Sequence, residues 1–202
     1  MVETTGHIEG MARTDVRERL LTAGLEALHK HGFNATGVQD ITEAAKVPKG
    51  SFYNHFESKD ALGVEVVQHY AAKGAERRQL LVEGAGPPLV RLRTYFKELN
   101  QRGPATGFSR GCLLGNFGTE LPAQSPAIRT ALEVAFDDWA KAIAQVIREA
   151  QKAGDVSKDL SAETLANFLL NAWEGAVMRS KVEKDAAALD AFLSVTFNKI
   201  LT

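Results

Sequence analysis

Apolar residues recur along this chain at intervals of three and four, which is the period of an α-helix. The strict alternation that indicates β-strands is nearly absent. Glycines, prolines and capping residues divide the pattern into about nine segments. The helices that we expect span residues 13–30, 36–45, 48–56, 59–82, 88–101, 113–121, 125–152, 161–183 and 185–201. The pattern therefore predicts an all-α fold.

The spacing of the breaks suggests two structural units. We expect residues 13–60 to form a small three-helix unit with a helix-turn-helix, and residues 61–202 to form a larger helical bundle. The polar residues 1–12 are set aside as a disordered or vector-derived tail. Because the fourth helix begins directly after the third, no flexible linker is expected, so movement in the bundle could reach the first unit.

Composition excludes several classes of protein. The 202 residues are 45% hydrophobic and carry a net charge of -1, which suits a sizeable core and gives no global attraction to nucleic acid. No apolar run approaches the roughly 18 residues of a membrane span. Without an apolar leader, and with a single cysteine that fits a reducing compartment, the chain is expected in the cytoplasm. All five histidines precede residue 70, and we expect neither a metal nor a cofactor.

The stretch KVPKGSFYNHFESKDAL, residues 46–62, combines an apolar stripe with polar side chains. Phe52 and Phe56 lie four residues apart, as anchors of a short helix would. The charges between residues 46 and 59 are three lysines against one glutamate (Lys46, Lys49, Lys59 and Glu57), so the segment is locally basic. Two short helices joined by a tight turn form a helix-turn-helix, whose second helix lies in the major groove of DNA.

The longer stretch GFNATGVQDITEAAKVPKGSFYNHFESKDAL, residues 32–62, resembles the DNA-binding signature of the TetR family of bacterial transcriptional regulators. Members of that family are homodimers that bind palindromic operators and release them when a ligand enters the C-terminal bundle. The resemblance implies a ligand-responsive regulator, in most cases a repressor, and no enzyme. Its partners would be double-stranded operator DNA, a second copy of the chain, and an unknown small-molecule or electrophile inducer.

The resemblance also implies which residues contact DNA. Thr36 would cap the second helix and bind phosphate, Gln39 would face the groove, and Lys59 would reach phosphate from the fourth helix. The complete expected set is Thr36, Gln39, Lys49, Gly50, Ser51, Tyr53, Asn54, His55 and Lys59. Two residues depart from the family pattern, because Gly37 stands where a hydroxyl residue is frequent and Lys46 where glycine is frequent.

The signal is expected to act within the middle helices of the bundle, where aromatic residues recur at helical spacing. Asn116 and Glu120, one turn apart, are expected to provide the polar groups that an apolar pocket requires. The candidate residues for binding or sensing the effector are Cys112, Asn116, Phe117, Glu120, Trp139, Trp173, Glu174 and Lys181.

Cys112 is the only cysteine. If Ser109 caps the following helix, Cys112 lies in its first turn, where the helix dipole and Arg110 would favour a thiolate. The GCL element and the later WEGAVMRSK, residues 173–181, resemble a TetR subgroup that responds to electrophiles and oxidants, and Lys181 matches a lysine of that subgroup. The alternative is that Cys112 is a small buried apolar residue.

The last two helices carry apolar residues around much of their circumference. They could pair with the same helices of a second copy and form a four-helix dimer interface. The candidate interface residues are Leu165, Leu169, Ala172, Ala176, Phe192 and Thr196. The alternative is that these residues fill the core of a single copy.

Two other functions compete with regulation of transcription. An all-α enzyme would need a nucleophile and a base, but the C-terminal part contains no histidine and its acids lie mostly on solvated faces. A helical interaction module could use the basic segment to bind protein or RNA. Binding to duplex DNA that depends on operator symmetry would distinguish a regulator from both.

Overall fold

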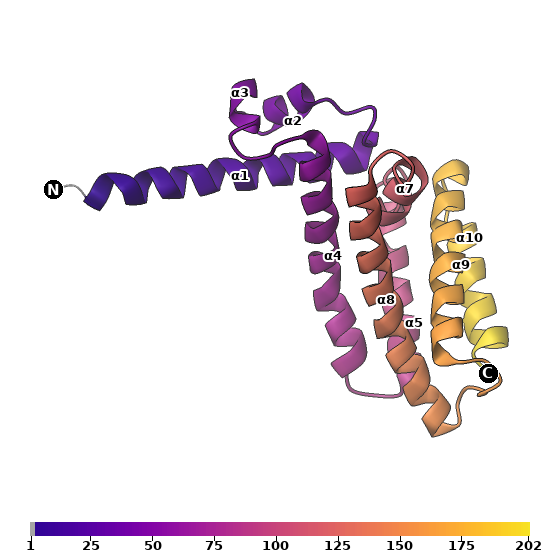
Figure 1. The fold of residues 1–202 in the computed structure, drawn as a ribbon. Helices are drawn as coiled ribbons and strands as arrows, with labels where there is room; N and C mark the ends of the chain where they lie inside the picture. Colours follow the sequence, from indigo (N-terminus) through magenta and orange to yellow (C-terminus); the bar gives the residue numbers. More distant parts are fainter. Residues whose placement is uncertain (1–2) are drawn as a thin grey trace. The chain divides into compact units, whose positions relative to one another are not determined.

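The structure is a computed structural model that describes residues 3–202, with side chains described from Asp15 onward, and every regular element in this part of the chain is a helix (Figure 1). The α-helices are α1 Glu3–His31, α2 Val38–Ala44, α3 Lys49–Phe52, α4 Lys59–Glu83, α5 Pro88–Asn100, α6 Arg102–Ala105, α7 Leu113–Glu120, α8 Pro126–Ala153, α9 Ala162–Glu183 and α10 Ala187–Val195. A π-helical turn, Thr196–Ile200, follows α10. The predicted all-α fold is confirmed.

The observed helices differ from the expected ones in several places. Helix α1 already begins at Glu3, so residues 3–12 of the expected tail are helical, and residues 1 and 2 lie outside the described part. Helix α3 ends at Phe52, and the chain then turns, with the amide of His55 donating to the carbonyl of Phe52 at 3.0 Å. The expected loop after α5 contains the single turn of α6.

The backbone divides into two compact units. The first comprises the chain up to Tyr70 together with Asn116–Leu132, and the second comprises Ala71–Gly115 and Glu133–Thr202. Three helices, α4, α7 and α8, cross from one unit to the other, so the expected boundary after residue 60 falls within α4. Among the described residues, no helix has the length and apolar character needed to cross a membrane.

The first unit packs α1, α2 and α3 around fully buried side chains, which include Leu20, Leu28, Ile41, Phe52 and Leu62. Arg17 of α1 fastens this unit to the start of α4, because one guanidinium nitrogen lies 2.6 Å from both carboxylate oxygens of Glu65. The same guanidinium lies 5.1 Å from the centre of the Phe56 ring. The anchoring role predicted for Phe52 and Phe56 agrees with their burial.

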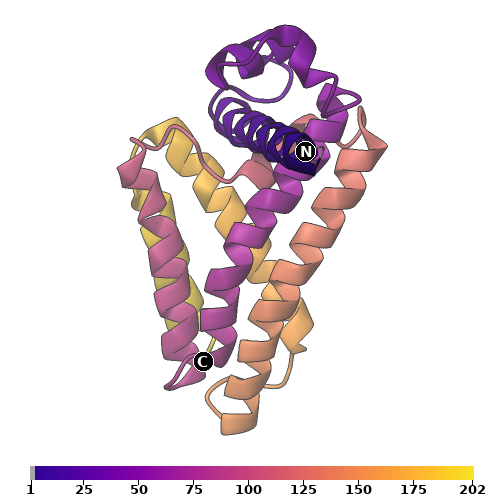
Figure 2. The same cartoon turned by 90° about the vertical axis from the view of Figure 1, so that its left-hand side faces the viewer.

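In the second unit, α10 packs against both α9 and α5 (Figure 2). Arg91 of α5 donates to the carbonyls of Leu81 and Val82 at the end of α4, at 2.9 and 2.6 Å, and pairs with Glu149 of α8. These contacts satisfy carbonyls that a helix terminus leaves without intrahelical partners. One arginine therefore joins three helices.

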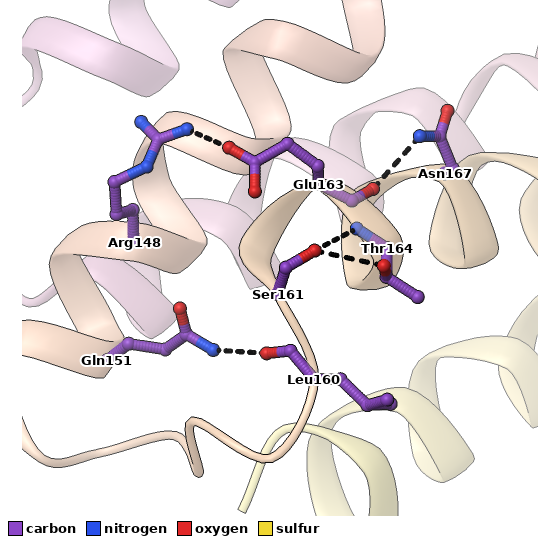
Figure 3. A network of polar contacts seen from close by, with 7 residues as sticks. All are labelled: Arg148, Gln151, Leu160, Ser161, Glu163, Thr164 and Asn167. Atoms are coloured by element: carbon purple, nitrogen blue, oxygen red, sulfur yellow. Dashed lines mark hydrogen bonds and ion pairs between the residues drawn. The ribbon is translucent and has the colours of Figure 1, made fainter.

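The turn from α8 to α9 is held by a polar network (Figure 3). Ser161 caps α9 by accepting the amide of Thr164 at 3.1 Å, and Arg148 of α8 pairs with Glu163. Gln151 donates to the carbonyl of Leu160 at 2.9 Å. Because its start is capped and tied to α8, α9 has a defined position from which it presents Trp173 and Glu174.

Candidate functional sites

The helix-turn-helix consists of α2, α3 and the turn between them. Gly37 caps α2, and its amide donates to the Asp40 carboxylate at 2.7 Å. Lys46 adopts φ 55°, the left-handed conformation for which glycine is best suited. Arg19 of α1 donates to the carbonyls of Ala45 and Lys46 at 2.7 and 2.9 Å, which satisfies the end of α2.

Thr36 does not have the role expected from the resemblance. It does not cap α2, because Gly37 holds that position. Its hydroxyl donates to the carbonyl of Gly32 at 2.7 Å, and the residue is only 2% exposed. We therefore withdraw the expected phosphate contact for Thr36: its side chain supports the end of α1 from within the unit.

The other residues expected to contact DNA, on α2, on α3 and in the turn after α3, form an accessible surface. Tyr53 is 60% exposed, Asn54 and Lys49 are exposed, and Ser51 and His55 are half-buried. Gln39 is exposed on α2, where its amide donates to Glu43 at 2.9 Å. A Cβ on Gly50 would have no atom within 4 Å, so nothing inside the protein requires a glycine there. The open space beside Gly50 suits close approach of an external group.

Lys59 makes contacts inside the protein that the sequence did not predict. Its ammonium donates to the carbonyls of Phe33 and Thr36, both at 3.0 Å, and lies 4.4 Å from the centre of the Phe33 ring. The charge thus stabilises the segment between α1 and α2, and the phosphate contact expected of this half-buried residue stays a prediction. Both acceptors are main-chain groups distant in sequence, which local sequence patterns do not reveal.

The residues expected to share one effector pocket are divided between the two units. Asn116, Phe117 and Glu120 belong to the first unit. Phe117 is fully buried there, edge-on to Phe33 with 5.8 Å between ring centres. Glu120 accepts the amides of Phe33 and Asn34 at 3.0 and 2.6 Å, so its carboxylate does not orient a ligand as expected. These contacts are a role for Glu120 that sequence reasoning missed.

The second unit brings the other candidates together. The rings of Trp139 and Trp173 meet edge to face with 5.3 Å between centres, and the indole of Trp173 donates to Asn100 at 2.9 Å. Both tryptophans are about 5% exposed or less. They form an aromatic cluster in this unit, and Trp173 directly precedes Glu174 in α9.

Cys112 lies immediately before α7 and is 3% exposed. The amides of Leu114 and Gly115 donate to its sulfur, and its thiol donates to the carboxyl of Glu174. Burial, followed by the negative charge of Glu174, raises the pKa of the thiol well above its ordinary value. The expected thiolate is therefore wrong for this arrangement. The expected cap is also absent, because the Ser109 hydroxyl donates to Thr106 at 2.7 Å.

Glu174 is a largely buried carboxyl. Burial raises its pKa to about 7, although the hydrogen bond from Cys112 acts in the opposite direction. Its Oε1 atom is buried without a hydrogen-bond partner. A Cβ on Gly115 would stand 2.2 Å from Oε2, so the carboxyl can occupy this place only because residue 115 is a glycine. Glu174 and the first turn of α7 are thus in direct contact.

Lys181 of α9 lies against Gly111, the residue that precedes Cys112. A Cβ on Gly111 would stand 2.7 Å from its Cδ atom, which places the lysine stem against the residue before Cys112. Burial, and then the charge of Lys184, lowers the pKa of Lys181. Nowhere in the described part of the chain do three or more His, Cys, Asp or Glu side chains form a possible metal site.

A groove of about 650 Å³ runs between α9 and α10 and is lined by four of the six residues expected at a dimer interface (Ala172, Ala176, Phe192 and Thr196). The other two, Leu165 and Leu169, are 4% and 0% exposed, so they belong to the core of one copy. Phe168 is instead 50% exposed and lines the groove. Both faces of α9 are apolar, so the sequence could not tell which one points outward.

Known proteins resemble both parts of this chain. Residues 20–66 match the family described as bacterial regulatory proteins, tetR family, and residues 88–196 match the tetracyclin repressor-like C-terminal domain. The transcriptional repressor DhaR of Mycobacterium sp. is 42% identical over 192 residues, which cover 95% of each chain.

Solved structures agree with the sequence matches. The regulatory protein TetR from Rhodobacter sphaeroides superposes with a TM-score of 0.85 at 36% identity, covering 92% of this chain and 98% of its own. The reduced form of NemR from E. coli has a TM-score of 0.80 at 25% identity, covering 89% of this chain and 95% of its own.

The buried carboxyl makes stability depend on pH. Glu174 has an ordinary pKa of 4.5 and a pKa of about 7 in the folded protein, so between these values the folded state keeps a proton that the unfolded chain has lost. The free energy of unfolding should therefore fall by roughly 3 kcal/mol as pH rises from 4.5 to 7. In Glu174→Gln this fall should be absent, which denaturant titrations across that range would measure. The exposed Glu133→Gln is the control, and an unchanged pH profile in Glu174→Gln would contradict the assignment.

Proposed function

This chain belongs to the TetR family of bacterial regulatory proteins, and we propose on that premise that its dimer represses transcription by binding a palindromic operator. The observation that carries the proposal is the accessible surface of α2, α3 and the turn after α3, where Lys49, Tyr53 and Asn54 are exposed and Gly50 has open space beside it. Family membership also decides against an all-α enzyme. Since its target is the chromosome, the protein acts in the cytoplasm.

Repression is supported by the names of the relatives, because DhaR of Mycobacterium sp. and NemR of E. coli are both called transcriptional repressors. A dimer is supported by the groove between α9 and α10, whose lining includes the half-exposed apolar residues Phe168 and Val195. A second copy that covers these side chains would give the dimer two helix-turn-helix units, one for each half of a symmetric DNA site.

Phosphate and base contacts are assigned to different side chains. Lys49 and Tyr53 bind the DNA backbone and fix the position of the protein, together with the half-buried Ser51 and His55. Asn54 reads base edges, since an amide presents both a donor and an acceptor in the major groove. Gln39 extends this surface from α2.

Single substitutions should separate these two roles. Lys49→Ala should weaken binding to all duplexes alike and reduce the slope of log affinity against log salt by about 1. Asn54→Ala should instead change the preference among operator variants. Fluorescence titrations with the best genomic duplex would measure both, with the exposed Lys152→Ala in α8 as a control. If neither variant differs from that control, α3 is not the reading helix.

The signal is assigned to Cys112 and its surroundings. A buried thiol is a poor nucleophile until its proton leaves, and the Glu174 carboxyl is its hydrogen-bond acceptor. When the sulfur adds to the β-carbon of an unsaturated aldehyde or quinone, the thiol proton passes to Glu174 and then to the enolate of the adduct. A solved structure of the relative NemR is described as its reduced form.

The added group would have to fit among packed groups, including the Glu174 carboxyl, the first turn of α7 and the stem of Lys181. Packed interiors respond by shifting between discrete arrangements. Operator release follows if the adduct is less stable in the DNA-bound arrangement than in the free one. A reversible ligand held by Trp139 and Trp173 is the second candidate for the signal.

Cys112→Ser distinguishes the two kinds of signal. Acrolein, an unsaturated aldehyde, should release wild-type protein from the operator and leave the serine variant bound, because a hydroxyl does not add to it under the same conditions. The measurement is the operator-bound fraction against acrolein concentration, with mass spectrometry of the adduct. Equal release of the serine variant would show that Cys112 is a core residue.

A further inference from the structure

Two side chains of opposite charge hold the main chain of the α1–α2 loop, residues 32–36. Lys59 of α4 donates to the carbonyls of Phe33 and Thr36, both at 3.0 Å. Glu120, the last residue of α7, accepts the amides of Phe33 and Asn34 at 3.0 and 2.6 Å. Hydrogen bonds with one ionised partner are roughly twice as strong as neutral ones. The loop is therefore fixed through both its donors and its acceptors.

Apolar contacts reinforce the same arrangement. The Phe33 ring lies under the Lys59 ammonium and meets Phe117 of α7 edge to face. Gly32 has φ 88°, and a Cβ there would stand 3.4 Å from a carboxylate oxygen of Glu120. Helix α7 thus contacts the loop with a ring and with a carboxylate, and the loop leads directly into the cap of α2.

The other end of α7 carries the signal site. The helix is continuous from Leu113 to Glu120, about 12 Å at 1.5 Å per residue. Its first amides, those of Leu114 and Gly115, donate to the Cys112 sulfur, and Gly115 lies against the Glu174 carboxyl. An adduct on Cys112 removes its interaction with Glu174 and adds bulk at the start of this short helix.

We propose that Glu120 is the positioning residue through which α7 couples the Cys112 site to the DNA-reading helices. While the carboxylate holds the amides of Phe33 and Asn34, α2 and α3 keep the geometry that binds the operator. When α7 is displaced at its first turn, Glu120 leaves the loop and affinity falls. This inference rests on the proposed function, because it concerns the control of operator binding.

The direction in which operator affinity changes distinguishes a positioning role of Glu120 from a purely electrostatic effect of its charge. Removing a negative charge from a DNA-binding unit ordinarily strengthens binding, because repulsion with phosphate decreases. Loss of the Glu120 contacts should weaken binding instead. Glu57→Gln is the matched control, since Glu57 is an exposed carboxylate between α3 and α4 for which the structure shows no hydrogen bond to the loop.

The experiment compares operator affinity of the full-length wild type, Glu120→Gln and Glu57→Gln, before and after treatment with acrolein. We expect Glu57→Gln to bind as tightly as wild type or more tightly. Glu120→Gln should bind at least about tenfold more weakly before treatment, the effect of losing hydrogen bonds to a charged group, with unchanged sequence preference. Acrolein should then change its affinity little, whereas wild type should respond fully.

Glu120→Asp is a second variant that keeps the test informative if Glu120→Gln fails to fold. It keeps the charge but is one methylene shorter, so it should retain part of the affinity and part of the acrolein response. If Glu120→Gln or Glu120→Asp folds and behaves as Glu57→Gln does, the proposal is overturned. A weakened variant that still shows the full wild-type response overturns the coupling role.

The outcomes also separate this inference from the proposed function. If wild type binds no genomic duplex, the proposed repressor function fails. If wild type binds but acrolein has no effect, Cys112 sensing fails, and the untreated comparison of Glu120→Gln with Glu57→Gln still decides whether Glu120 positions the loop.

Discussion

The conformation of the α1–α2 loop is the constraint on which DNA reading depends. Helix α2 has seven residues and α3 has four, and isolated helices shorter than roughly 12 residues are marginal in water. Tertiary contacts must therefore hold both in place. Phe52 and Ile41 supply the buried apolar anchors, while Lys59 and Glu120 fix the main chain that leads into α2. The accessible surface can stay polar because the residues beneath it provide the stability.

The second unit, in contrast, contains a buried carboxyl group that lacks part of its hydrogen bonding. Glu174 lies against the first turn of α7 with one oxygen unpartnered, and its raised pKa reflects the cost of burying its charge. Unsatisfied buried polar groups are uncommon, and they concentrate where a protein performs a function. The thiol, the carboxyl and the glycine that admits it form a site at which a chemical change alters packing.

Helix periodicity and the helix-turn-helix were predictable because they depend on residues close together in sequence. The period of three and four, the breaks at Gly32 and Pro122, and the anchors Phe52 and Phe56 all act locally. The roles of Thr36, Lys59 and Glu120 were not predictable, because their partners are main-chain groups, and those of Glu120 lie 86 and 87 residues away. Sequence also could not show whether Leu169 or Phe168 of α9 points inward.

For Cys112, the residues close in sequence predicted a pKa shift in the wrong direction. Its position at the start of a helix, after an arginine, favoured a thiolate. In the fold, burial and a neighbouring carboxyl outweigh these effects, so the thiol keeps its proton. Neither burial nor the contact with Glu174, far along the chain, can be read from the residues around Cys112.

The coupling through Glu120 is tested most directly by residue-resolved hydrogen exchange at the Phe33 and Asn34 amides, which donate to the Glu120 carboxylate. This coupling predicts strong protection of both amides in the operator complex and faster exchange once acrolein has modified Cys112, while amides in the middle of α9 stay protected. Equal protection before and after modification, in protein that has released its operator, would contradict it.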